Sequence, residues 1–287
     1  MANSAVGVRA VIKSTPATPT TEGAGVKLNR IFGRADPRLD PFLLLDDFRS
    51  DKPDDYIKGF PWHPHRGIET ITYMLRGEME HRDSLGNGGV LRAGDVQWMT
   101  AGRGIIHEEM PHQTDGLLWG FQLWANLPAS HKMMPPRYQD ISAHNLPVAQ
   151  VGPGARARVI CGEAGGVRGP VQEIITDPTY LDVSLSSNGY MRHPLPPSHN
   201  AMVYVVAGSV RFGPEEKGAV AAGNLAMLGP GDRIKAFTSG GGARFLLLAG
   251  QPLQEPVAWR GPIVMNTDQE LELAFKQFQD GTFLKAG

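Results

Sequence analysis

The chain has 287 residues and a formal net charge of −1, with 28 basic and 29 acidic side chains. This length accommodates two domains, and the even mixture of charges excludes a basic stripe for nucleic acid. The single cysteine excludes an internal disulfide framework and is typical of a reducing compartment. No run is apolar and long enough to span a membrane, and residues 1–9 lack the features of a signal peptide. We therefore expect a cytoplasmic protein with no direct nucleic-acid or membrane partner.

The first 125 residues predict many short strands and no long helix. The whole chain contains 35 glycines and 23 prolines, a composition that suits strands joined by turns. Residues 69–75 alternate in the pattern of a half-buried strand, and residues 94–104 predict a second strand that ends in a glycine-bearing turn. The turn-rich segment 86–89 between them would bring both strands together in a barrel.

A polar, proline-rich run at residues 133–140 interrupts this pattern and predicts a linker between domains. Strand-like runs resume beyond it, at residues 157–160, 180–185, 202–206 and 244–248. We therefore expect an N-terminal barrel over residues 1–128, a linker over 129–147 and a second barrel over 148–287.

One helix is predicted near the end of the chain, at about residues 268–279. Thr267 can cap its first turn, and Glu270 completes a capping box three residues later. Four apolar residues then fall on one face at helical spacing, and Gly281 is suited to end the helix. These four residues are Leu271, Ala274, Phe275 and Phe278. We expect the helix to cover a sheet, with partner binding as the alternative.

Two short motifs carry side chains that bind metals. His63-x-His65 and His107-x-Glu109 each place two donors at positions i and i+2. Side chains two apart on a β-strand point to the same face, so each motif aims both donors the same way. Three imidazoles and one carboxylate suit a divalent transition metal and leave coordination positions open. Either motif alone is more often a pair of surface residues, and their position beside predicted strands favours a site.

Two other carboxylates lie near these motifs. Glu108 should face away from the donors if its segment is extended. Glu69 comes four residues after His65, and we expect it to orient a histidine, with direct metal coordination as the alternative.

The two halves of the chain resemble each other. Residues 73–79 resemble 204–210, and at similar spacing residues 90–96 resemble 220–226. Such a repeat predicts a duplicated β-barrel. Alignment without gaps places the four candidate ligands opposite Pro194, Pro196, Ala236 and Thr238. The sequence therefore predicts metal chemistry in the first barrel alone.

At this level of detail the chain resembles the pirin family. Residues 60–70 and 97–111 look like the two signature segments of that family, and the likeness extends to residues 39–48, 250–257 and 261–267. Pirins are bicupins, with two jelly-roll barrels in one chain. The resemblance thus implies an all-β fold of two cupin-type barrels, to which the predicted C-terminal helix is added.

The resemblance also implies a mononuclear Fe(II) centre, held by residues that match His63, His65, His107 and Glu109. The same donor set accepts Mn, Co, Ni, Cu or Zn. The implied activity is that of a quercetin 2,3-dioxygenase, in which O₂ adds to a flavonol and the heterocyclic ring is cleaved with loss of carbon monoxide. Glu109, or a water near it, would accept the proton of the substrate hydroxyl, which makes it the candidate catalytic residue.

Two other classes of function stay open. The chain resembles proteins that act through protein partners, as a transcription cofactor or as a regulator of a metabolic enzyme, and its iron would then sense redox state. A metal that only stabilises the fold is a third reading, which open coordination positions argue against. We expect an oxidoreductase whose partners are a flavonol-like small molecule and O₂. Five residues are candidates for the apolar wall of its pocket, with barrel core as the alternative: Trp62, Trp98, Met99, Met110 and Phe121.

Overall fold

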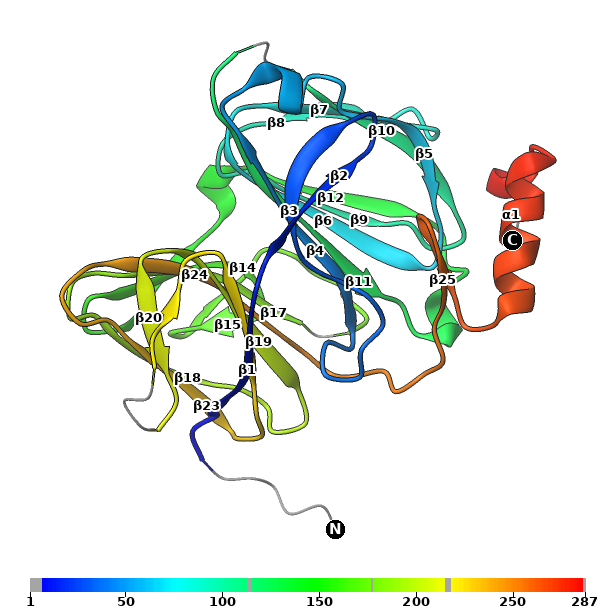
Figure 1. Ribbon diagram of the computed structural model, residues 1–287. Helices are drawn as coiled ribbons and strands as arrows, with labels where there is room; N and C mark the ends of the chain where they lie inside the picture. Colours follow the sequence, from blue (N-terminus) through cyan, green and yellow to red (C-terminus); the bar gives the residue numbers. More distant parts are fainter. Residues whose placement is uncertain (1–6, 113–114, 177, 215–217, 286–287) are drawn as a thin grey trace. The chain divides into compact units, whose positions relative to one another are not determined.

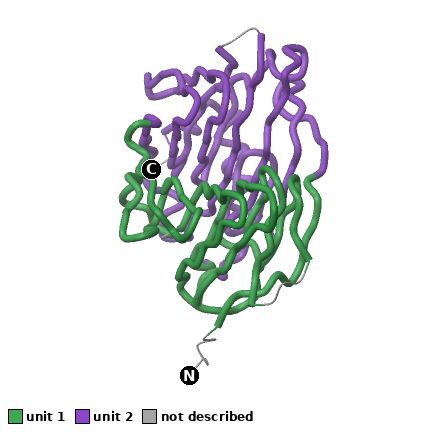
Figure 2. Tube along the Cα trace, turned by 90° about the vertical axis from the view of Figure 1, so that its left-hand side faces the viewer, with its two compact units in different colours: residues 1–17, 36–41, 144–252 green, residues 18–35, 42–143, 253–287 purple. Residues whose placement is uncertain are grey.

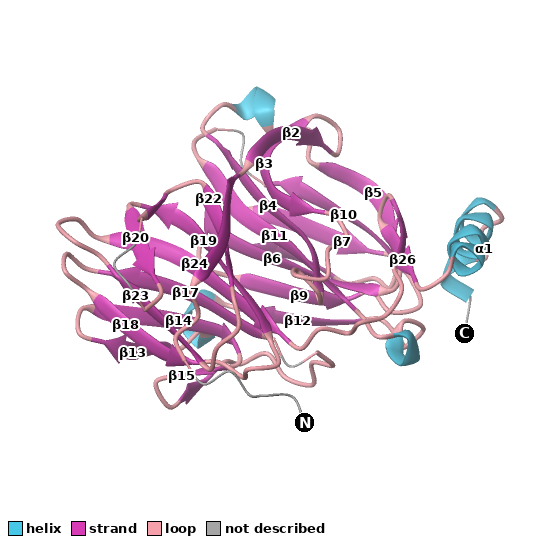
Figure 3. Cartoon of the chain, turned by 60° about the horizontal axis from the view of Figure 1, so that its bottom comes forward, coloured by secondary structure: helices cyan, strands magenta, loops and turns pink. Residues whose placement is uncertain are grey.

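The structure is a computed structural model that describes residues 7–112, 115–176, 178–214 and 218–285. Most of the N-terminal stretch that was judged not to be a signal peptide lies outside the described residues. Strands dominate, with one α-helix among the described residues, so the all-β prediction is confirmed (Figure 3). Within these ranges no helix combines the length and the apolar character needed to cross a bilayer.

The chain divides into two compact units whose boundaries differ from the predicted domains (Figure 2). The first barrel comprises residues 18–35, 42–143 and 253–287, and the second barrel comprises residues 1–17, 36–41 and 144–252. The N-terminal segment is therefore grouped with the second barrel, and the C-terminal segment, residues 253–287, is grouped with the first barrel. The alternation of a segment predicts a strand but does not say which sheet edge that strand will join.

The first barrel consists of a seven-stranded and a four-stranded sheet, counted over its described residues. The larger sheet runs β12-β9-β6-β11-β4-β3-β2 and the smaller β5-β10-β7-β8 (Figure 1). The strands are β2 (Thr18–Glu22), β3 (Val26–Gly33), β4 (Phe42–Ser50), β5 (Phe60–His65), β6 (Ile68–Arg76), β7 (Met79–Asp83), β8 (Gly88–Leu91), β9 (Val96–Thr100), β10 (Ile105–Pro111), β11 (Leu118–Asn126) and β12 (Arg137–Ile141). A C-terminal hairpin, β25 (Ala258–Arg260) and β26 (Ile263–Met265), precedes helix α1 (Asp268–Gln279).

The second barrel repeats this plan over its own described residues. Its seven-stranded sheet runs β1-β22-β19-β24-β17-β14-β13, and its four-stranded sheet runs β18-β23-β20-β21. The strands are β1 (Val11–Pro16), β13 (Val148–Gly152), β14 (Ala155–Cys161), β17 (Thr179–Leu185), β18 (Tyr190–Pro194), β19 (Asn200–Ala207), β20 (Ser209–Phe212), β21 (Val220–Ala221), β22 (Asn224–Leu228), β23 (Arg233–Phe237) and β24 (Ala243–Gly250), with the short pair β15 (Glu163–Ala164) and β16 (Val167–Arg168). The matching sheet orders bear out the internal repeat.

Strand register corrects the alignment of the two barrels. In the first barrel His107 pairs with His63 across β10 and β5, and in the second barrel Ile234 pairs with His193 across β23 and β18. His193 therefore corresponds to His63, and Leu195 to His65. The alignment without gaps failed because His107 follows Val96 by 11 residues, whereas Ile234 follows the matching Leu225 by 9 residues. The second barrel keeps one histidine of the constellation and has apolar residues at the other two imidazole positions.

Part of the predicted linker is a strand of the first barrel. β12 pairs with β9 along its whole length, from Arg137 opposite Thr100 to Ile141 opposite Val96. An edge strand needs only one hydrogen-bonded neighbour, and its outward side chains remain polar. Its composition therefore resembles that of a linker.

The predicted helix is present, but it belongs to the first barrel. Thr267 caps α1 and forms the expected capping box with Glu270. Leu271 and Ala274 are buried, whereas Phe278 is exposed. Helix α1 packs on the C-terminal hairpin in an apolar cluster that includes Phe283. The helix thus covers strands as expected, but these are the two strands of the C-terminal hairpin and not a sheet of the second barrel.

The two barrels differ in how their interiors are filled. Among the described residues, a large cluster of buried apolar side chains occupies the interior of the second barrel. The described apolar residues of the first barrel form separate clusters, with polar groups between them. Only an interior that is not packed with side chains leaves space for a ligand. The first barrel is therefore the unit in which a site is expected.

Candidate metal centre

Two antiparallel strands bring the histidines together. β5 and β10 pair so that His107 lies directly opposite His63, and His65 lies two residues along the same face of β5. His65 and His107 are buried, and His63 is partly buried. The register shifts between His107 and Glu109, which is the irregularity expected of a β-bulge. Pairing and alternation of the strands thus gather three imidazoles that the sequence separates by 44 residues.

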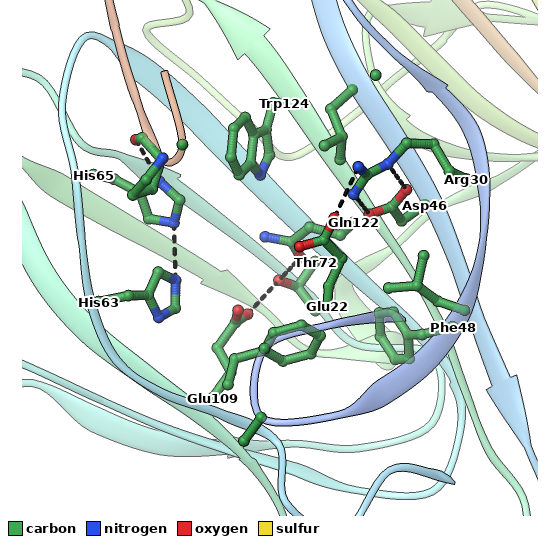
Figure 4. Close-up of a pocket in the computed structure, with 18 of the residues that line it drawn as sticks. Glu22, Arg30, Asp46, Phe48, His63, His65, Thr72, Glu109, Gln122 and Trp124 are labelled. Carbon is green, nitrogen blue, oxygen red and sulfur yellow. Dashed lines mark hydrogen bonds and ion pairs between the residues drawn. The ribbon is translucent and has the colours of Figure 1, made fainter. Parts of the chain in front are cut away.

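The ring nitrogens of these histidines converge. Nε2 of His63 lies 3.0 Å from Nε2 of His65 and 3.0 Å from Nε2 of His107. One ligand atom from each of the three residues lies within 4.8 Å of the other two. Figure 4 shows His63 and His65 directed toward each other at one side of a cavity. The structure therefore brings together three of the four predicted ligands.

The hydrogen bonds at Nδ1 of His63 and His65 show that the converging Nε2 atom of each ring carries a lone pair. Nδ1 of His63 donates to the Pro61 carbonyl at 2.9 Å, and Nδ1 of His65 donates to the Pro262 carbonyl at 3.0 Å. A carbonyl only accepts, so the proton of each neutral imidazole is on Nδ1. Burial lowers the pKa of His63, His65 and His107, which keeps the rings neutral. Lone pairs that face each other repel unless a cation lies between them, so the donors fit a metal ion.

Glu109 lines the same cavity but does not join the three histidines. Its carboxyl is buried and lies 3.0 Å from the Thr72 hydroxyl, which is also 2.6 Å from Gln122 Oε1 (Figure 4). Thr72 has one proton and cannot donate to both oxygens. The second contact requires either a proton on Glu109 or the amide nitrogen of Gln122 turned toward Thr72. Burial raises the pKa of Glu109 to about 7, so the protonated and ionised forms are both well populated near neutrality.

A cavity of about 700 Å³ extends from the histidines into the first barrel. Its lining mixes polar and apolar residues, and four aromatic side chains, Phe48, Phe60, Trp124 and Trp259, belong to it. None of the five predicted wall residues lines this cavity. Trp98, Met99 and Phe121 are barrel core, Trp62 is 51% exposed, and Met110 lies outside the lining. The prediction of an apolar wall was right in kind and wrong in its residues.

The cavity also carries a charged group that sequence reasoning missed. Arg30 donates to both oxygens of Asp46, at 2.9 and 2.8 Å, and lies 2.8 Å from Glu22. Asp46 is buried, and the Glu22 side chain is 42% exposed. Two carboxylates around one guanidinium leave a net negative charge at this part of the cavity. Inward alternation on β3 and β4 was the one available signal, and it gave no reason to select these residues.

Other predicted roles divide between agreement and correction. Glu108 forms an ion pair with Arg82 at 2.9 Å, so it faces away from the histidines as expected. Glu69 is buried and accepts a hydrogen bond from Thr100 at 2.7 Å, outside the histidine group. His81, which belongs to neither motif, is buried and stacks on Tyr138.

The fold and the site together define a class of protein. Two β-barrels of one plan, with three converging imidazoles beside a cavity in one of them, make this chain a bicupin with a metal-compatible centre. Residues 25–125 match the model of the Pirin family, and residues 180–284 match that of the pirin C-terminal cupin domain. The chain belongs to the pirin family.

Similar proteins cover nearly the whole chain. A Pseudomonas aeruginosa protein named as a candidate quercetin 2,3-dioxygenase is 45% identical over 95% of this chain and 97% of its own length. A pirin-like protein of Caulobacter vibrioides is 45% identical over 96% and 99%. The crystal structure of a quercetin 2,3-dioxygenase from Acinetobacter baumannii superposes with a TM-score of 0.89 at 33% identity, covering 96% of this chain and 98% of that one.

Proposed function

We propose that the chain is a metal-dependent dioxygenase that cleaves the heterocyclic ring of quercetin-like flavonols with O₂. In this proposal Fe(II) is held by His63, His65, His107 and Glu109. The observation that carries it is the convergence of three imidazole rings, two of them with the lone pair on Nε2, at one side of a cavity of about 700 Å³ whose lining includes Phe48, Phe60, Trp124 and Trp259. The names of similar proteins add support, because two of those cited are quercetin dioxygenases by name.

The proposed chemistry divides between the metal and the residues around it. A metal ion held by these residues would act as a Lewis acid and would lower the pKa of a flavonol hydroxyl. Glu109 lies in the same cavity, and its pKa near 7 suits a group that accepts that proton at neutral pH. Thr72 contacts the Glu109 carboxyl and thereby sets its direction. Phe60 and Trp124 provide flat apolar surfaces that exclude water from an aromatic substrate.

The charged group in the cavity suits the hydroxyl groups of such a substrate. Every nitrogen of the Arg30 guanidinium contacts a carboxylate oxygen, so its charge is already balanced. Glu22 is partly exposed and has oxygen lone pairs to spare, which accept hydrogen bonds from phenolic hydroxyls. We therefore assign recognition of the hydroxylated ring of the flavonol to Glu22, and alignment of Glu22 to Arg30.

The test is reconstitution with Fe(II) without oxygen, followed by addition of O₂ and quercetin. Loss of flavonol absorbance and release of carbon monoxide are the expected readouts. His63→Ala should lower both iron content and turnover by more than about 100-fold, because a direct ligand contributes more than its supporting groups. Glu109→Gln should do the same for turnover, and Glu108→Gln on the same strand is the matched control.

Absence of turnover at full iron occupancy would overturn the enzymatic proposal. A regulatory protein is then the next reading, and it predicts that binding to a protein partner differs between ferrous and ferric forms.

A further inference from the structure

The ring of His65 is held by a segment of the chain that is far away in sequence. Its Nδ1 donates to the carbonyl of Pro262, 197 residues later, at 3.0 Å. Pro262 lies in the turn between β25 and β26, and the same hairpin contributes Trp259 to the cavity wall. Trp124 contacts the His65 ring edge-on at 5.1 Å and the Trp259 ring at 5.9 Å between centroids. The C-terminal hairpin thus borders both the ring of His65 and the cavity.

The residue after His65 fastens this segment in place. The Arg66 carbonyl accepts a hydrogen bond from Val264 N at 3.1 Å. The guanidinium of Arg66 is buried and donates to Gln277 Oε1 at 2.6 Å and to the Phe283 carbonyl at 2.8 Å. The same group also donates to the Arg103 carbonyl, and it lies 4.1 Å above the Phe283 ring. One arginine therefore ties β5, helix α1 and the end of the chain together.

The hydrogen-bond acceptors around Arg66 constrain the direction of its side chain more than apolar packing alone would. A buried arginine usually pairs with a carboxylate, whereas the Arg66 guanidinium contacts neutral oxygens and an aromatic ring. An apolar side chain would fill this space at lower desolvation cost. The hydrogen bonds instead fix the direction of the main chain at Arg66, and the ring of the preceding residue must follow that direction.

We infer that the C-terminal segment, residues 258–285, is a positioning element of the metal centre. The Pro262 carbonyl fixes the proton of His65 on Nδ1, so that Nε2 is presented as a donor, and Arg66 latches the segment in the position that allows this bond. The inference rests on the proposed function only in assigning a metal ion to the three histidines. Groups that orient a ligand in this way typically change metal affinity by about 10–100-fold.

Metal affinity of the intact chain tests the inference without any turnover. The dissociation constant for Co(II) is measured by chelator competition, and the visible spectrum of the Co(II) protein reports ligand geometry. Arg66→Met should weaken Co(II) binding by about 10–100-fold and alter the spectrum, and Arg66→Lys should restore part of the affinity. Gln277→Ala should act in the same direction with a smaller effect.

Gln279→Ala is the matched control, because Gln279 is an exposed glutamine on the same helix. It should leave the Co(II) affinity unchanged. If Arg66→Met does not fold, Gln277→Ala with Phe283→Leu supplies the comparison. Variants that lose stability but bind Co(II) as tightly as the wild type, with the same spectrum, would overturn the inference and leave the dioxygenase proposal standing.

A wild type that binds Co(II) but does not convert quercetin would overturn the proposed reaction and leave the positioning role intact. A wild type that binds no Co(II) would refute the metal assignment and the inference together.

Discussion

Replacing Glu109 by glutamine should change how the stability of the metal-free protein, measured in EDTA, depends on pH. Burial raises the pKa of the Glu109 carboxyl from 4.5 to about 7, and the hydrogen bond with Thr72 opposes this only in part. Between these two pH values the folded protein keeps a proton that the unfolded chain has released. Wild-type stability therefore falls as pH rises through this window, relative to a variant that cannot ionise.

The size of the effect follows from the shift. Each pKa unit corresponds to about 1.4 kcal/mol, so a fully ionised Glu109 destabilises the folded protein by about 3 kcal/mol. Urea unfolding in EDTA, from pH 4 to pH 8, measures it. Glu109→Gln should match the wild type near pH 4 and be about 3 kcal/mol more stable at pH 8. A stability difference that stays constant over this range would refute the reasoning.

The neighbouring carboxylate and the metal provide the controls. Glu108→Gln removes the partner of Arg82 and should keep the pH-dependent step of the wild type. Added Co(II) should reverse the order of wild type and Glu109→Gln at pH 8, because a ligand that binds the folded state stabilises it in proportion to its affinity. Equal stabilisation of both proteins by Co(II) would remove Glu109 from the proposed ligand set.

Three further predictions concern the support of the site, the second barrel and the substrate. Gly67→Ala should lower stability to urea by more than about 2 kcal/mol, because the backbone angle φ is +78° and the new Cβ would meet the Val264 carbonyl oxygen. Gly86→Ala, with φ at +86° and open space around it, should lose about half as much. Leu247→Ala should lower stability by about 2–5 kcal/mol without changing metal stoichiometry, since its side chain fills the second barrel. Under anaerobic conditions, a flavonol that lacks hydroxyl groups on its pendant ring should bind about 10-fold more weakly than quercetin. The Glu22→Leu variant should abolish that difference in affinity.

The short-range patterns of the sequence determined the elements and the donors. Alternation predicted the strands that became β6, β14, β17, β19 and β24, and the Thr267 capping box located helix α1. The spacing of His63 and His65 and the presence of His107 indicated a shared face, because side-chain direction on a strand repeats every two residues. These are local properties, so they can be derived from neighbouring residues alone.

Tertiary structure decided which segments meet. The exchange of the two chain ends between the barrels, the strand within the expected linker and the pairing of His193 with Ile234 depend on sheet edges and registers. Hydrogen bonding between main chains is nearly independent of residue type, so a sequence pattern does not encode the partner of an edge strand.

The same limit applies to the candidate site. The sequence supplied three imidazoles and a carboxylate, but the direction of Glu109 toward Thr72 and the contact of Pro262 with His65 arise only in the folded chain. A backbone carbonyl has no signature in the sequence, because every residue carries one. The identities of the donors were therefore fixed by composition and spacing, whereas the orientation of His65 and Glu109 was fixed by contacts across 197 and 37 residues of the chain.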